Sequence, residues 1–303
     1  MSTEQLSVLG VPSSAGSYAS GQEDAPGALR DAGLIRKINA ASTRPVYDIG
    51  DLPRYRWRPD RAQPRAQNLD EVVATATRVS EVVNSSLEAG GSLLVLGGDC
   101  TIGIGVVAGC VAAGLDPGLV YFDMHTDLNT PSSVIDGALD WMGLAQMLGI
   151  EGSVEALRDI GIRSPLLSIE NVAVIGFEHS QATEWERDLI DRMGLKSVAA
   201  DDVRADPHAA SRTALDMLVE TAGPLVAHFD VDVIDFVDAP LSENTGRNVG
   251  ITLEHALAVM DDLVDEPRVR VLTITELNPH HAGADPESFA RFVTRLARAA
   301  SRL

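Results

Sequence analysis

The chain has 303 residues, 45% of them hydrophobic, and a formal net charge of −20. This length allows one large or two ordinary domains with a sizeable buried core, and the negative charge argues against nucleic-acid binding, which depends on Lys and Arg neutralising phosphates. The sequence opens without a signal-peptide pattern and has no apolar run near the roughly 18 residues that span a bilayer, so we expect a cytoplasmic protein that does not bind membranes.

Short apolar runs typical of strands recur along the chain, with helix-like stretches between most of them. The runs cover residues 5–10, 44–49, 92–96, 118–123, 171–176, 195–199, 225–230 and 268–275. The clearest helical stretches extend from Asp70 to Glu88, from Asp202 to Glu220 and from Pro286 to Leu303. This alternation predicts an α/β protein with a mostly parallel, eight-stranded sheet and helices on both faces. No break in composition divides residues 1–303, so we expect a single domain.

Three other segments bear on the position of a surface loop, on nucleotide binding and on disulfide bonds. The Pro- and Arg-rich residues 53–64 look like a surface loop. The glycines at 103, 105 and 109 have the wrong spacing for a dinucleotide-binding loop, and the acidic partner of such a loop is missing. Cys100 and Cys110 are too few for a disulfide framework, and a helix between them is expected to keep them apart.

Two acidic clusters directly follow apolar runs, F-D-M-H-T-D at 122–127 and F-D-V-D at 229–232. Because the carboxyl ends of parallel strands meet at one edge of a sheet, the two clusters can share one pocket. Four carboxylates in one pocket raise each other's pKa, and a cation is the simplest relief. The alternative is that both motifs are only caps or loop salt bridges at strand ends. The occurrence of two such motifs, each directly after an apolar strand, makes this alternative less favoured than a metal site.

The ligand types indicate which cation this would be. Carboxylates with His125, and with Cys100 as a further candidate, suit hard or borderline ions such as Mn²⁺ better than a closed tetrahedral zinc site. The set is too large for one tetrahedral ion. Two ions that share bridging carboxylates account for its size, and such a centre can generate a hydroxide at neutral pH.

Four ordered motifs resemble the signatures of the arginase family of ureohydrolases. The family segments G-G-D-H, D-A-H-x-D, S-F-D-x-D and E-x-N-P correspond to residues 97–100, 123–127, 229–232 and 276–279, with Asp235 after the third. Residues 8–12 and 26–30 also resemble the first strand and first helix of the family. The resemblance runs from about residue 6 to residue 300 and implies a single-domain, three-layer arginase-like fold.

The resemblance also implies roles for individual residues around two Mn²⁺ ions. Asp123 and Asp230 would be the carboxylates that bridge the two ions. Cys100 and Asp127 would complete the first ion, and His125 and Asp232 would complete the second. The hydroxide would attack a guanidinium carbon while Glu276 holds the guanidinium nitrogens. Asp127, Glu276 and Asp140 are thus the expected catalytic residues.

The substrate expected from the resemblance is a small guanidino amino acid. Asn129 matches the arginase form of its motif, in which the asparagine faces the α-carboxylate of the substrate. Gln181 takes the place of an aspartate that serves the α-amino group in arginases, which makes that contact less certain. Asn129, Gln181 and Glu276 are therefore the expected substrate-binding residues. The sequence leaves the oligomeric state open between a monomer and a homotrimer.

Two departures from the family pattern bear on the substrate. Cys100 stands where the family has a histidine ligand. It would bind its ion as a thiolate, which is a softer ligand than imidazole. Alternatively, it is an inert buried cysteine, and the ion lacks one ligand. A neighbouring dication favours the thiolate. Asp140 replaces the proton-shuttle histidine of the arginase stretch S-G-N-L-H-G. It could act as an acid only with a raised pKa, and otherwise it is a solvated loop aspartate.

Both departures together resemble the Nω-hydroxy-L-arginine amidinohydrolases of D-cycloserine biosynthesis, which release hydroxyurea and L-ornithine. An N-hydroxyguanidine is less basic than a guanidine, so it needs less help from a proton shuttle. The alternatives are an arginase, a ureohydrolase of another guanidino or formimino acid and, more remotely, a catalytically silent binding protein. Retention of the carboxylate and histidine ligands argues against the silent protein.

Overall fold

The computed structural model describes residues 5–221 and 223–303 and is built around one eight-stranded sheet. The strands are β1 (Leu6–Gly10), β2 (Val46–Asp51), β3 (Ser92–Leu96), β4 (Gly118–Phe122), β5 (Val172–Phe177), β6 (Lys196–Ala199), β7 (Leu225–Asp230) and β8 (Val269–Thr275). Their order across the sheet is β2-β1-β3-β8-β7-β4-β5-β6, and every pair is parallel. The predicted sheet is confirmed, and it is wholly rather than mostly parallel.

Twelve α-helices and five short 3-10 helices accompany the strands among the described residues. The α-helices are α1 (Ala25–Asp31), α2 (Leu34–Ala41), α3 (Leu69–Glu88), α4 (Ile102–Ala112), α5 (Gly143–Leu148), α6 (Glu155–Arg158), α7 (Glu184–Met193), α8 (Ala200–Ala205), α9 (Pro207–Asp216), α10 (Leu253–Asp265), α11 (Pro279–Ala282) and α12 (Pro286–Ala300). The 3-10 helices are η1 (Gln22–Asp24), η2 (Asp140–Met142), η3 (Ile169–Asn171), η4 (His179–Gln181) and η5 (Val231–Val233).

One predicted helix is wrong in its extent. The stretch from Asp202 to Glu220 forms two helices, α8 and α9, that meet at Asp206 and Pro207. Pro207 lacks the N–H that would continue α8, and its fixed φ suits the first position of a new helix. The side chain of Asp206 caps α9 by accepting hydrogen bonds from the backbone N–H groups of His208 and Ala209, both at 3.0 Å.

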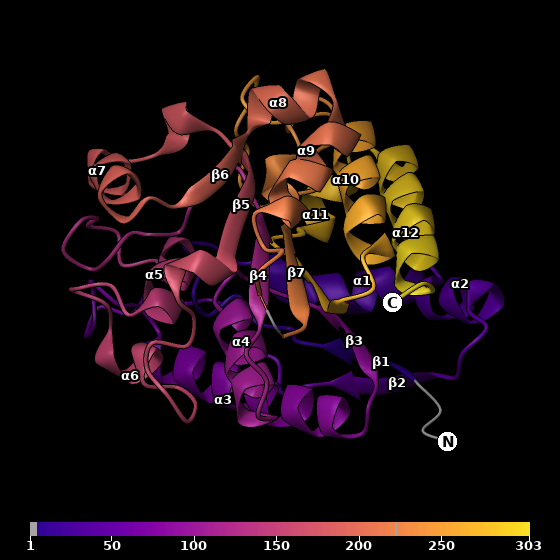
Figure 1. Cartoon of the computed structure of the whole chain (residues 1–303), viewed down its shortest axis with the longest axis horizontal. Coiled ribbons are helices and arrows are strands. Elements are labelled where there is room, and N and C mark those ends of the chain that lie inside the picture. The colour runs from indigo at the N-terminus through magenta and orange to yellow at the C-terminus, as the bar shows by residue number, and fades with distance from the viewer. Residues whose placement is uncertain (1–4, 222) are drawn as a thin grey trace.

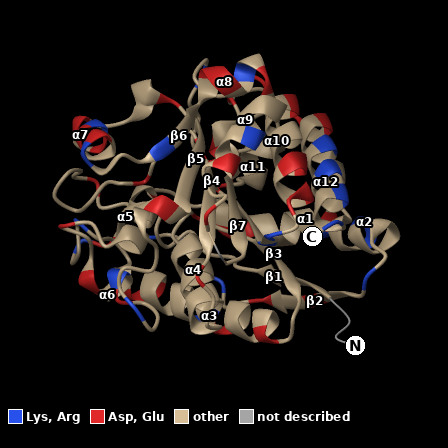
Figure 2. Cartoon of the chain, in the orientation of Figure 1, with Lys and Arg blue, Asp and Glu red and all other residues tan. Residues whose placement is uncertain are grey.

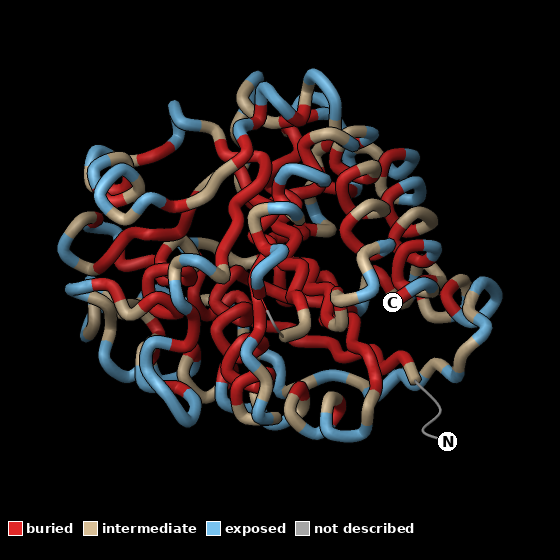
Figure 3. The backbone as a smooth tube through the Cα atoms, viewed as in Figure 1, coloured by how far each residue is buried: buried red, intermediate tan, exposed pale blue. Residues whose placement is uncertain are grey.

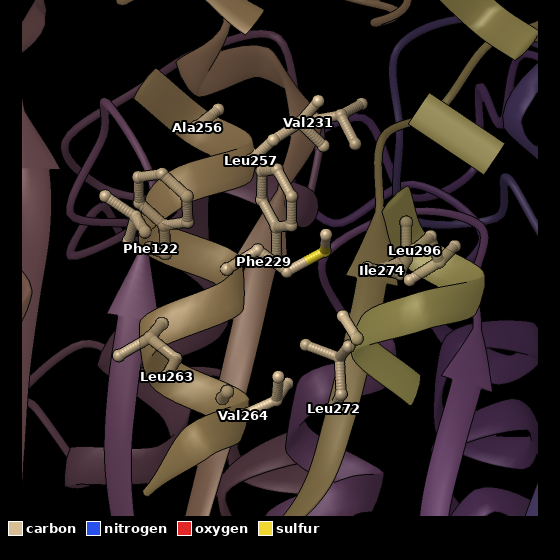
Figure 4. Packing of buried hydrophobic residues seen from close by; sticks show 14 of the residues in the cluster. Phe122, Phe229, Val231, Ala256, Leu257, Leu263, Val264, Leu272, Ile274 and Leu296 are labelled. Carbon is tan, nitrogen blue, oxygen red and sulfur yellow. The ribbon is translucent and has the colours of Figure 1, made fainter. Parts of the chain in front are cut away.

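The sheet separates two apolar layers, because successive strand residues point to opposite faces. On β3, Leu94 and Leu96 belong to the layer under α2, α9, α10 and α12, whereas Leu93 and Val95 belong to the layer under α3, α4 and α5 (Figure 1). In the first layer the stacked rings of Phe122 and Phe229 have centroids 4.8 Å apart (Figure 4). Buried backbone is concentrated in the strands, and the exposed segments lie at the periphery (Figure 3). This is the predicted three-layer arrangement.

The glycines at 103, 105 and 109 have a packing role rather than a role in nucleotide binding. A Cβ added at Gly105 would lie 2.4 Å from the carbonyl oxygen of Ala76, and one at Gly109 would lie 2.7 Å from that of Ser80. Both carbonyls belong to α3, so the glycines allow the backbones of α3 and α4 to approach closely. Residues 102–111 of α4 are all buried as a result.

The charged residues are mainly on the outer helices and loops (Figure 2). On α12, Arg291 pairs with Glu254 of α10 at 3.0 Å, and Arg302, just after α12, pairs with Asp265 of α10 at 2.7 Å. Exposed pairs of this kind each contribute at most about 1 kcal/mol. In the part of the chain that the structure describes, no helix has the length and apolar character needed to cross a membrane.

Candidate metal centre and substrate cavity

The four sequence motifs follow four neighbouring strands, β3, β8, β7 and β4, and they meet at the carboxyl edge of the sheet. Asp123 and Glu276 are the first residues after β4 and β8, and Asp230 is the last residue of β7. Cys100 lies in the turn between β3 and α4. In this turn, a Cβ on Gly98 would lie 1.8 Å from the carbonyl oxygen of Ser13, so only glycine allows this close approach.

In two of the candidate carboxylate ligands, Asp123 and Asp232, the protein fixes one oxygen and leaves the other unpaired. Asp123 Oδ1 accepts a hydrogen bond from the backbone of His125 at 2.6 Å, and Asp232 Oδ2 accepts one from Asn244 Nδ2 at 3.2 Å. Asp123 Oδ2 and Asp232 Oδ1 are buried and have no hydrogen-bond partner among the described residues. Because an unpaired buried oxygen is costly, these atoms fit the role of cation ligands.

The candidate ligand atoms form overlapping groups. One atom each from Cys100, Asp123 and Asp127 lie within 4.8 Å of one another, and so do atoms from Asp123, His125 and Asp232. A third group joins Cys100, Asp230 and Glu276 within the same distance. Asp123 belongs to the first two groups. The described residues therefore offer two adjacent ligand sets that share a carboxylate.

Burial and mutual repulsion shift the protonation of this cluster when no cation is bound. Burial, and then Asp232, raise the pKa of Asp123 to about 7, and burial with neighbouring carboxylates raises the pKa of Asp127 and Asp230 well above the usual range. Burial alone would lower the pKa of His125, but Asp232 and Asp123 raise it overall. Burial would raise the pKa of Asp232, but His125 lowers it overall. A dication would allow all four carboxylates to ionise.

The Cys100 thiol lies deep in this cluster. Its Sγ is 2.7 Å from Asp230 Oδ2, to which the thiol donates, 3.2 Å from Thr275 Oγ1 and 3.4 Å from His228 Nε2. Burial, and then Asp230, raise the pKa of Cys100 well above that of a free thiol, so the sulfur keeps its proton in the absence of a cation. Metal binding would displace that proton.

Two candidate site residues have left-handed backbone conformations, with φ of 50° at Asp127 and 59° at Glu276. Non-glycine residues in this region store roughly 1–3 kcal/mol each and persist where the surroundings hold them. The Tyr121 hydroxyl donates a hydrogen bond to Asp127 Oδ2. Glu276 Oε1 accepts from the backbone N–H of Cys100 and Oε2 accepts from Gln22 Nε2, both at 2.9 Å.

A cavity of about 400 Å³ opens onto these groups, a volume within the usual range for small-molecule sites. It is lined by most of the candidate ligands and by Glu276, Tyr18, Asp136, Asp140, Trp141, Gln181 and Asn244. Among its described lining residues none is Lys or Arg, so the cavity is suited to a cationic ligand. Burial, and then Asp140, raise the pKa of Glu276, and a bound cationic group would counter that shift.

The predicted substrate and catalytic residues fall in different places. Asp140 lines the cavity at the start of η2, where burial and then Asp99 raise its pKa well above that of a free aspartate. Gln181 also lines the cavity, with an exposed side chain. Asn129 is only 1% exposed and does not line the cavity. Its Oδ1 accepts hydrogen bonds from Ser133 and Thr183, both at 3.0 Å.

Several residues that support the site were not found from the sequence. Glu186 Oε1 accepts hydrogen bonds from Thr126 Oγ1 at 2.9 Å and from the backbone of Leu128 at 3.3 Å, and so fixes the loop after β4. Tyr121 and His228 are hidden inside apolar strand runs, and Gln22 lies in an early segment without a motif. The one available signal was the polar ring of His228 in an otherwise apolar run.

The chain is similar to known proteins over nearly its whole length. A family model for the arginase family matches residues 4–301. The arginase of Bacillus subtilis strain 168 is 31% identical to this chain over 277 residues, covering 90% of each, and human arginase-1 is 27% identical, covering 95% of this chain and 89% of its own. A crystal structure of Bacillus subtilis arginase superposes with a TM-score of 0.84 at 28% identity, covering 99% of this chain and 98% of that one.

Proposed function

The chain belongs to the arginase family, and we propose that it is a two-manganese amidinohydrolase that cleaves Nω-hydroxy-L-arginine to hydroxyurea and L-ornithine. The observation that carries the substrate assignment is Asp140. This residue lines the cavity together with Glu276, at the position where the family stretch S-G-N-L-H-G has histidine. The Cys100 thiol, which stands at the position of a family histidine ligand and lies 2.7 Å from Asp230, supports the same assignment.

The residues present fit two manganese ions. By the family pattern, both ions would share Asp123 and Asp230. Cys100 and Asp127 would complete the first ion, and His125 and Asp232 would complete the second. Asp123 lies within 4.8 Å of ligand atoms of both sets. Mostly oxygen ligands with one imidazole suit Mn²⁺. The positive charge of the ions would also satisfy the unpaired buried oxygens of Asp123 and Asp232. When bound, the ions would lower the pKa of a water so that it can attack a guanidino carbon near neutral pH.

The protein residues would then hold the substrate and move its protons. Glu276 accepts hydrogen bonds from the guanidino N–H groups and fixes the carbon for attack. The water oxygen bonds to that carbon, and Asp127 accepts the water proton on the oxygen not used by Tyr121. The bond from the carbon to the side-chain nitrogen breaks, and that nitrogen takes a proton from Asp140. Burial, and then Asp99, raise the pKa of Asp140 well above that of a free aspartate, which favours the protonated form that can donate.

The proton inventory favours the hydroxylated substrate. The guanidinium of arginine is not deprotonated in practice, because its pKa exceeds about 12. The hydroxyl group of an N-hydroxyguanidine withdraws electrons, so a neutral form is accessible near pH 7. A carboxyl group at 140 is a poorer proton donor near neutral pH than the imidazolium of the family's shuttle histidine. The exchange would therefore cost arginine hydrolysis up to the 10²–10⁴ typical of general acid–base catalysis, and would cost hydroxyarginine hydrolysis less.

Arginine itself is the second candidate substrate. Two observations favour it: the arginase of Bacillus subtilis and the mitochondrial arginase-2 of rat are 31% and 26% identical to this chain, and Asn129 matches the arginase form of its motif. The buried position of Asn129 weakens its assignment as a direct contact, whereas Gln181 lines the cavity and would meet the amino-acid end of a substrate. Both substrates would use the same ligands and the same Glu276.

A parallel assay of the manganese-loaded protein tests the proposal. We expect a much higher kcat/KM for hydroxyarginine, measured as hydroxyurea and ornithine release, than for arginine, measured as urea and ornithine release. Asp140→His should raise arginine turnover more than hydroxyarginine turnover. Asp136→His is the matched control, because it places an imidazole elsewhere on the cavity lining and should leave the ratio unchanged. Comparable kcat/KM values for the wild-type protein would replace the proposal with an arginase.

A further inference from the structure

His228 is a buried polar residue next to the proposed metal centre that has no role in the mechanism above. It lies on β7 with 1% of its surface exposed. Only one of its ring nitrogens has neighbours: Nε2 is 3.2 Å from Thr275 Oγ1 and 3.4 Å from Cys100 Sγ. Nδ1 has no partner in the described part of the chain. Since buried polar atoms are usually paired, this one-sided arrangement calls for a reason.

The imidazole ring is held in one orientation from two sides. His228 and Tyr121 are register partners on β7 and β4, and their rings stack with centroids 4.5 Å apart and planes within 5°. Tyr121 is itself anchored through its hydroxyl to Asp127. Near the Nδ1 edge, Gly103 leaves the space, because a Cβ there would lie 3.1 Å from Nδ1. The surroundings therefore direct Nε2 at the sulfur.

The contacts of the sulfur indicate which nitrogen carries hydrogen. The thiol donates its own proton to Asp230 Oδ2 at 2.7 Å, and a carboxylate is a better acceptor than an imidazole nitrogen. The sulfur lone pairs are then the groups that face His228. A neutral imidazole has one N–H. With hydrogen on Nε2 this donor has two acceptors in reach, whereas hydrogen on Nδ1 would have none among the described residues.

We propose that His228 is a positioning residue whose Nε2–H donates a hydrogen bond to the Cys100 sulfur and orients that sulfur as a ligand for a divalent cation. The hydrogen bond also stabilises the negative charge that the sulfur gains when a cation displaces its proton. His228 belongs to none of the clusters of candidate ligand atoms, so it acts through Cys100 rather than on the cation. This inference rests on the proposed metal centre but not on the substrate.

Three substitutions of His228 separate donation from space filling. His228→Phe keeps a ring that can stack on Tyr121 and removes both nitrogens, one of which is unpaired in any case. His228→Gln places an amide N–H near the position of Nε2, whereas His228→Asn is too short to reach the sulfur. The polar pair Gln and Asn thus differs only in reach, and comparing the two still tests hydrogen-bond donation if the Phe variant fails to fold.

The readouts are cation affinity and a spectroscopic signature rather than activity. Co²⁺ is titrated into the metal-free protein while calorimetry gives the affinity and absorbance gives the sulfur-to-cobalt charge-transfer band. We expect the Phe and Asn variants to bind the ion next to Cys100 about 10–100-fold more weakly, as for other residues that support metal ligands, with a weaker band. The Gln variant should stay close to the wild-type protein.

A double substitution supplies the decisive control. In a Cys100→Ala background, His228→Phe should have little further effect on Co²⁺ affinity, because the sulfur that it serves is gone. An equal loss in both backgrounds, or a Phe or Asn variant with wild-type affinity and band, would overturn the proposal. Absence of the sulfur band in the wild-type protein would overturn it too. A wild-type protein that shows the band but hydrolyses no guanidino substrate would refute the proposed function alone.

Discussion

Replacement of Glu276 by Gln tests how the cavity holds a guanidino group. Both carboxylate oxygens already accept a hydrogen bond from the protein, from Cys100 N and Gln22 Nε2 at 2.9 Å each. A glutamine amide would turn its NH₂ group toward one of these donors and would lose the charge that faces the substrate. Removing one partner of a buried, hydrogen-bonded charge pair costs about 2–5 kcal/mol, which corresponds to a roughly 30- to 5,000-fold loss of kcat/KM.

The assay follows ornithine release from hydroxyarginine, together with the metal content and the thermal unfolding of the metal-free protein. We expect Glu276→Gln to keep two ions per chain and to lose activity, because Glu276 is assigned to the substrate. Glu151→Gln, on an exposed turn, is the control and should change nothing. A loss of less than about threefold would refute the reasoning. Loss of an ion would make Glu276 a ligand, which its proximity to Cys100 and Asp230 permits.

Three further predictions concern the ligands and the surface. Asp230→Asn should remove nearly all activity and lower the metal content; full activity with one ion per chain would contradict a shared centre. Cys100→Ser should weaken metal binding, whereas Cys100→His should still fold and bind two ions. A manganese-loaded crystal structure in which the Cys100 sulfur lies more than about 3 Å from both ions would exclude Cys100 as a ligand. Arg30 lowers the pKa of Asp48 through hydrogen bonds of 2.8 and 2.9 Å. The ionised Asp48 carboxylate therefore stabilises the fold at pH values above its unfolded pKa of about 3.9. This contribution is lost as the pH falls through the lower pKa of the folded state. Asp48→Asn should therefore lower stability by up to about 1 kcal/mol at pH 7 and by less at pH 2.5, and an equal difference in chemical denaturation at both pH values would contradict the pairing.

Most of the sheet was predictable because parallel strands are buried on both faces and appear in the sequence as continuous apolar runs. β3, with all five residues buried, matches its run at 92–96 at both ends. β2 lies at the edge of the sheet with four of its six residues exposed, so its apolar signal is weaker and its bounds, Val46–Asp51, differ from the run at 44–49. The break at Pro207 was missed because the apolar spacing continues through it.

Some residues of the candidate site were likewise predictable from the sequence, and others were not. Asp123, His125 and Asp230 stand out in the sequence because acidic and imidazole groups directly after apolar strands have few structural uses. Tyr121 and His228 could not be recognised, because residues inside a fully buried strand give no sign of which face they occupy or which strand lies beside them. Their stacking depends on the register of β4 against β7, which no local pattern encodes.

The position of β8 has a consequence for how the molecule is made. This strand is the last of the eight to be synthesised, yet it lies between β3 and β7, which are not otherwise paired. Before residue 275 leaves the ribosome, the nascent chain can form only two separate partial sheets, one from β1–β3 and one from β4–β7. Joining them requires pairings between segments far apart in sequence, which form slowly, and the unpaired edges of β3 and β7 invite association with other chains in the interval. Cys100, which follows β3, comes within reach of the ligands that follow β4 and β7 only when this last strand is inserted. The ion next to Cys100 would therefore gain its full ligand set only after the two partial sheets have joined.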